Sequence, residues 1–79
     1  MPRHKQEILA FDIRSVRMAR RVAQRDLAEA VGVKLPELKR WERGLELPNS
    51  GTLVKLAGFL HVDAGRLAEA QRRFVEIAT

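Results

Sequence analysis

The residues best suited to do chemistry are the cations that crowd residues 24–44, with the sequence QRDLAEAVGVKLPELKRWERG. Side chains such as Lys39, Arg40 and Arg43 bind anions, and phosphate is the usual one in biology. Residues 1–44 hold 11 Lys or Arg and six Asp or Glu, whereas residues 45–79 hold four of each. The net charge of +5 therefore belongs to the first half of the chain. We expect a polyanionic partner there, because neutralising phosphates releases counterions and drives binding.

What the sequence lacks excludes several other chemistries. There is no cysteine, so disulfides and Cys-based zinc sites are ruled out, and the two histidines, His4 and His61, make a metal site improbable. No Ser/His/Asp or Cys/His set, paired carboxylate or glycine-rich phosphate loop is recognisable, so we expect no enzyme, cofactor or small-molecule substrate. Without a signal peptide, a membrane-length apolar run or a broad amphipathic basic helix, we expect a cytoplasmic protein with no membrane contact.

A short helix is predicted at the start of the basic stretch. Leu27, Ala28 and Val31 lie on one face of a helix that begins near Gln24, and polar residues occupy the other face. Gly32 ends this helix, because the residue after a helix often needs a positive φ.

A second short helix follows after about three residues. Pro36 suits its first turn, Leu38 and Trp41 lie three residues apart on its inward face, and Gly44 ends it. Trp41 is a candidate for stacking on bases, but its spacing from Leu38 favours the core. Lys39 and its basic neighbours face outward. Two helices joined in this way match a helix-turn-helix, whose second helix enters the major groove of DNA.

Residues 13–67 resemble the Cro/C1-type helix-turn-helix family, also called XRE-like, of phage and bacterial repressors. The matching pieces are IRSVR at 13–17, QRDLAEAVGV at 24–33, LKRWERG at 38–44 and LPNSGTLVKLAGFLHVDAGRL at 47–67. The resemblance implies an all-α fold, a compact five-helix, lambda-repressor-like bundle in which helices 2 and 3 form the helix-turn-helix. It also implies double-stranded DNA as the partner, with a recognition helix at about 35–43 in the major groove.

The resemblance also assigns residues to roles at the DNA. The base-reading positions match Leu35, Pro36 and Arg40, with a further exposed position at Lys39. Leu35 and Pro36 can pack only on thymine methyl groups, so we expect few direct base contacts, supplemented by DNA shape or by a partner. The residues expected to contact phosphate are Gln24, Arg25, Lys34, Arg43 and Asn49. For Gln24 the alternative is an ordinary surface residue, and for Asn49 it is a helix cap.

Further structural expectations follow from matched and unmatched family positions. Arg17 and Glu42 match a family ion pair that ties the first helix to the third. Ala23 and Lys34 stand where the family has a capping Ser or Thr, and the helix that follows Ala23 should start more weakly by about 1 kcal/mol. His61 stands where the family favours a glycine, so the resemblance implies that His61 must adopt the left-handed backbone conformation that is uncommon for other residues.

The chain divides into three predicted regions. Residues 1–7 form a flexible basic arm, either disordered or in contact with DNA. Residues 8–70 form the helix-turn-helix domain, whose first helix runs from residue 8 or 12 to residue 22. Residues 71–79 extend the last helix, and Phe74 and Ile77 continue an apolar stripe from Leu67. That stripe either binds a second copy of the chain or folds back over the first helix.

Two functions of different classes fit these patterns. The first is a small transcriptional regulator, repressor-like and homodimeric, or an antitoxin that binds DNA and regulates its own operon. The second is a protein-interaction or scaffolding module that keeps the fold without reading an operator, which Leu35 and Pro36 favour.

Overall fold

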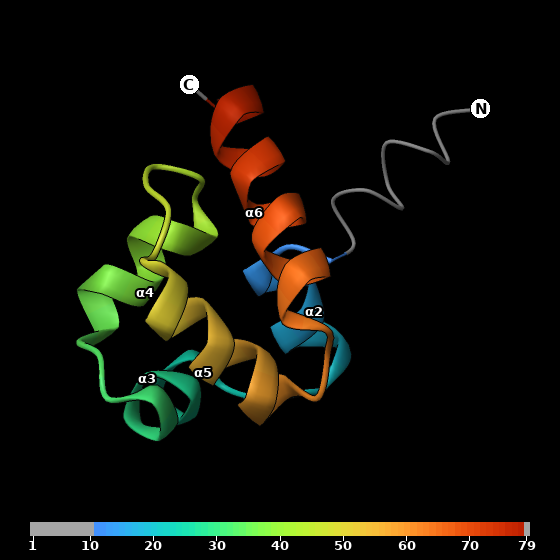
Figure 1. Ribbon diagram of the computed structural model, residues 1–79. Coiled ribbons are helices and arrows are strands. Elements are labelled where there is room, and N and C mark those ends of the chain that lie inside the picture. The colour runs from blue at the N-terminus through green and yellow to red at the C-terminus, as the bar shows by residue number, and fades with distance from the viewer. Residues whose placement is uncertain (1–10, 79) are drawn as a thin grey trace.

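The computed structural model describes residues 11–78 (Figure 1). This part of the chain folds into five α-helices without a β-strand, which confirms the predicted all-α, five-helix fold. The predicted arm at residues 1–7 lies outside the described residues. The helices are α2 (Ile13–Ala19), α3 (Gln24–Val31), α4 (Leu35–Glu42), α5 (Ser50–Leu60) and α6 (Ala64–Ala78).

Four helices end with the same backbone motif, in which one residue turns into the left-handed region. After α3 this residue is Gly32, with φ of 73°, and after α4 it is Gly44, with φ of 75°. Each time the following backbone N–H bonds back to the last turn, as Val33 N–H does to the Ala28 carbonyl at 3.0 Å.

The same motif ends α2 and α5 without glycine. Arg21 and His61 both have φ of 59°, which confirms the left-handed backbone expected at His61 and adds one at Arg21. The Arg20 guanidinium stabilises the end of α5, since it donates to the Leu60 carbonyl at 2.9 Å and to the His61 carbonyl at 3.2 Å. The positive charge of Arg20 also interacts favourably with the negative end of the helix dipole.

The first helix is shorter than predicted. It ends at Ala19 rather than at residue 22, because Arg21 adopts the left-handed conformation and Val22 N–H bonds back to the Arg17 carbonyl. This turn carries Val22 onto the core and leaves Ala19, the last residue of α2, exposed.

Each helix contributes to one apolar core. Leu56 and Leu60 of α5 lie at its centre, and α5 packs against α2, α3 and α6. Trp41 of α4 is only 5% exposed, so the prediction that it belongs to the core is confirmed. The other fully buried large apolar side chains are Ile13, Leu27, Leu38 and Leu67.

The helix starts differ in how well they are capped. The Asn49 side chain accepts the Thr52 N–H at 2.8 Å to cap α5, and the Asp63 side chain accepts the Arg66 N–H at 2.9 Å to cap α6. Ala23 provides no side-chain cap for α3, as expected.

A buried side-chain amide joins the last helix, α6, to α2 and α4. Gln71, which the prediction assigned to the C-terminal extension, is fully buried. Its Oε1 accepts the Ile13 N–H at 3.1 Å, and its Nε2 donates to the Trp41 carbonyl at 2.6 Å. Gln71 thus connects α6 to the start of α2 and to α4. In Figure 1, α6 continues beyond this point and lies beside the loop between α4 and α5.

Candidate nucleic-acid interface

Helix α4 has one anchored face and one basic face. Leu38 and Trp41 lie in the core on the anchored face. Lys39, Arg40 and Arg43 are exposed on the other side, Arg43 being the residue that follows the last turn. A helix held from behind in this way presents its cations at fixed positions along one side.

A buried charge network holds α4 against α2 and α3. Glu42 is 3% exposed, and its two carboxylate oxygens accept hydrogen bonds from Arg17 Nε at 2.6 Å and Arg17 Nη2 at 2.9 Å. The remaining Arg17 nitrogen, Nη1, donates to the Val22 carbonyl at 2.8 Å. Gln24, the first residue of α3, adds a third hydrogen bond to Glu42, from Nε2 at 3.0 Å. The network therefore fixes three helices relative to one another.

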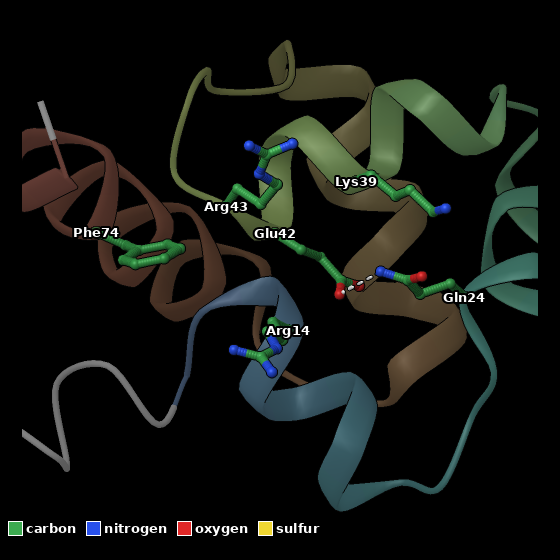
Figure 2. Close-up of a pocket in the computed structure, with 6 residues that line it drawn as sticks. All are labelled: Arg14, Gln24, Lys39, Glu42, Arg43 and Phe74. Carbon is green, nitrogen blue, oxygen red and sulfur yellow. Dashed lines mark hydrogen bonds between the residues drawn. The ribbon is translucent and has the colours of Figure 1, made fainter.

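This network also orients the Gln24 side chain. Figure 2 shows the Gln24 amide pointing at Glu42 from the start of α3. One amide hydrogen is used in that bond, and the amide has a second hydrogen that can still donate. The backbone N–H groups at the start of a helix have no intrahelical partner, so the surroundings of Gln24 favour an anion.

The predicted base-reading residues are not equally available. Pro36 and Lys39 are exposed, but Leu35 is half-buried and packs against the core. Arg40 Nε donates to Glu46 Oε1 at 2.7 Å, and both side chains are almost half exposed. An exposed pair of this kind contributes about 1 kcal/mol or less, so Arg40 can exchange Glu46 for another partner at low cost.

The predicted phosphate contacts lie at several helix ends. Arg25 and Lys34 are exposed near the starts of α3 and α4. Glu37 turns back toward the start of α4, where its Oε1 accepts the Lys34 N–H over a long 3.4 Å. Asn49 caps α5 through its Oδ1, which leaves its amide N–H₂ group for a ligand.

Phe74 and Ile77, the predicted dimer residues, lie in different environments. Ile77 is 66% exposed. Phe74 is half-buried and its ring lies close to Gly44, where an added methyl group would come within 3.3 Å of the ring and 2.7 Å of Ala78 Cβ. Phe74 thus faces the residue that ends α4 and is only partly available to a partner.

Asp12 is a buried carboxyl that the sequence did not single out. It is 4% exposed, and within residues 11–78 its Oδ1 has no hydrogen-bond partner. Burial raises the pKa of Asp12 above its ordinary value of 3.8, the Glu42 charge raises it further, and hydrogen bonds with Ser15 partly offset both. The sequence signal that could have singled out Asp12 is its place at the N-cap of α2, where Asp is a preferred residue.

An open trough runs between α2 and α4 and reaches α6 (Figure 2). Its volume is about 520 Å³. The sequence did not predict that Arg14 joins the α4 cations here, and no local pattern distinguishes Arg14 from its arginine neighbours. The trough is lined by Arg14, Gln24, Lys39, Glu42, Arg43 and Phe74.

Comparison with known families identifies the class of the protein. The model of the Cro/C1-type helix-turn-helix family matches residues 13–67, and the chain belongs to this family. Membership implies that the protein binds DNA as a transcription regulator, with α3 and α4 as its helix-turn-helix. Neither the curated proteins nor the solved structures include a significant match.

Residues 11–78 lack the features of two other classes of site. None of the helices there is both long and apolar enough to cross a membrane. The same residues contain no group of three or more His, Asp or Glu side chains placed to hold a metal ion.

Proposed function

We propose that this protein is a small repressor-like transcriptional regulator that places α4 in the major groove of duplex DNA. The observation that carries the proposal is the division of α4 into two faces. Its exposed side carries Lys39, Arg40 and Arg43, while Glu42 is locked to Arg17 behind it. A helix in the major groove has a phosphate backbone on either side of it. The cations of α4 and the neighbouring Gln24 amide can contact those phosphates.

The same face supports only modest reading of the base sequence. Arg40 is the one side chain of α4 with a guanidinium fork at a base-reading position, so a guanine contact is its expected use. Leu35 is partly packed into the core and Pro36 has no donor. We therefore propose binding that ranges from sequence-tolerant to moderately specific, with DNA shape supplying much of the preference.

A titration of labelled duplex DNA tests this function. A mixed-sequence duplex of about 20 base pairs is titrated with protein, and binding is followed by fluorescence anisotropy at salt concentrations from about 50 to about 200 mM. The double variant Lys39→Gln/Arg43→Gln should reduce the slope of log K against log salt by about 1.8, or about 0.9 for each lost phosphate contact. Binding by the wild type with this reduction supports the proposal.

The matched control removes two cations from another part of the surface. Arg72 and Arg73 of α6 are about half exposed and pair only with acidic neighbours on the same helix within the described chain. Arg72→Gln/Arg73→Gln has the same net charge as the α4 variant and should keep the wild-type slope. Equal slopes for both double variants, or no wild-type binding at about 50 mM salt, contradict the proposal.

Homodimerisation is a separate part of the proposal and rests on Ile77. This side chain is two-thirds exposed near the end of α6, where a second copy can bury it. Sedimentation equilibrium should show a dimer for the wild type and a weaker one for Ile77→Ser. A wild-type monomer at all concentrations that can be reached contradicts this part but leaves DNA binding by a monomer intact. A regulator of this kind acts in the cytoplasm, on the nucleoid of a bacterial host.

A protein-interaction module remains the second candidate, because the loop after α4 exposes Leu45 and Leu47 by 52% and 43%. An antitoxin would combine both activities, with DNA held by α4 and a second polypeptide bound elsewhere. Replacing both leucines with serine should leave DNA affinity unchanged under the regulator proposal.

A further inference from the structure

The trough between α2 and α4 joins cations from two elements that are distant in sequence. Arg14 comes from α2, while Lys39 and Arg43 come from α4 and its C-terminal end. Figure 2 shows Arg14 on the α2 side of the trough and the two α4 cations across from it. Arg14 lies one turn before Arg17 on α2, on the side that faces Glu42.

The charge of the trough is unbalanced. Glu42 is the acidic residue in its lining, and that carboxylate is already paired with Arg17 and bonded to Gln24. Within residues 11–78, Arg14, Lys39 and Arg43 form no ion pair. Three cations around one hollow repel one another, and an anion placed among them relieves that repulsion.

The shape of the trough favours a chain-like anion. It is open to solvent, and its lining residues Lys39 and Arg43 belong to the exposed cations of α4, so a bound chain can extend from the trough along α4. The Phe74 ring forms an apolar wall next to Arg43, where it can contact a sugar ring while the cations take phosphates.

We propose that this trough binds the sugar–phosphate backbone of one DNA strand, and that Arg14 of α2 is a phosphate-binding residue outside the helix-turn-helix. The inference rests on the proposed function, because it extends the DNA contact of α4 to a second element. It also gives Phe74 a use that does not require a second copy of the chain.

The test compares two single variants of equal net charge in the same salt titration. Arg14→Gln should bind DNA with a slope of log K against log salt that is lower by about 0.9, the value for one phosphate contact. Arg73→Gln is the control, since Arg73 lies exposed on α6 and pairs only with Glu69 in the described chain. It should keep the wild-type slope. Arg14→Lys should also keep it, because the charge remains. Circular dichroism checks that each variant is folded.

The outcomes separate this inference from the proposed function. Wild-type binding with the predicted loss of slope in Arg14→Gln alone supports it. Wild-type binding with equal slopes for Arg14→Gln and Arg73→Gln overturns it and leaves the proposed function standing. Absence of wild-type binding overturns both.

A second arm distinguishes DNA from a free phosphate-bearing molecule, which would present the same anionic group. Inorganic phosphate and pyrophosphate are titrated into the free protein, and the Arg14 Nε–H resonance is followed by NMR. Under the inference, DNA shifts this resonance and either small anion shifts it only weakly, at about millimolar concentrations. Saturation by either small anion at about micromolar concentrations would assign the trough to a small ligand and overturn the inference.

Discussion

Replacing Arg17 with methionine should expose how strongly the fold depends on one buried ion pair. The substitution removes both hydrogen bonds to Glu42 and leaves a carboxylate that is 3% exposed with the Gln24 amide as its remaining side-chain donor. Removing one partner of a buried pair costs about 3–5 kcal/mol. At about 0.05–0.15 kcal/mol per residue, the whole chain has a stability of about 4–12 kcal/mol. Arg17→Met should therefore lose at least a quarter of the stability and, at the lower limit, all of it.

Urea unfolding followed by the fluorescence of Trp41 measures this loss, since Trp41 is the only tryptophan and lies in the core. Arg17→Met, Glu42→Gln and the double variant complete a cycle, in which the double variant should be more stable than the sum of the single losses by about 2 kcal/mol. Arg73→Met is the control and should change stability by about 0.5 kcal/mol or less, because its pair with Glu69 is exposed. An Arg17→Met loss below about 1 kcal/mol, or strictly additive losses, would refute the reasoning.

Two further predictions concern buried polar groups. Gln71→Leu leaves the Ile13 N–H and the Trp41 carbonyl without their buried partner, so it should cost about 3 kcal/mol and lower the melting temperature by roughly 10–20 °C; a fall of less than about 4 °C in a thermal melt would contradict this. Asp12 has a raised pKa in the folded state, so its protonation stabilises the fold below the ordinary value of 3.8, and that contribution is lost as the pH rises through the folded pKa. Relative to the wild type, Asp12→Asn should therefore be more stable at about pH 7 than at about pH 4 in urea unfolding, whereas a difference independent of pH, or of the opposite sign, would count against burial as the cause.

Much of the fold could be predicted from short stretches of sequence. Gly32 and Gly44 end two helices because both turns need a positive φ, and the spacing of Leu38 and Trp41 predicts which side of α4 is buried. The positions of α3 to α5 were predicted within a residue or two for the same reason. The turn at Arg21 could not be predicted in this way, because arginine has no preference for the left-handed conformation that it adopts here.

For the candidate site, the sequence predicts which side chains face outward, because this depends on their spacing from buried residues of the same helix. It does not predict which groups they contact. Lys39 and Arg43 face outward, as their places beside Leu38 and Trp41 require. Their contacts with DNA, like those expected of Gln24, Arg25, Lys34 and Asn49, stay predictions. Arg40 lies where expected, but its partner Glu46 comes from the next loop, whose course the periodicity of α4 does not determine.

The sequence by itself determined where most helices lie, which faces are apolar and where the positive charge is concentrated, because these depend on residues within one or two turns of each other. The tertiary structure decided which distant groups meet. Gln71 is buried because two backbone groups, 58 and 30 residues away, need its amide. Arg14 faces the α4 cations because α2 packs beside α4. Such partnerships follow from the packing of whole helices, and no pattern along the chain specifies them.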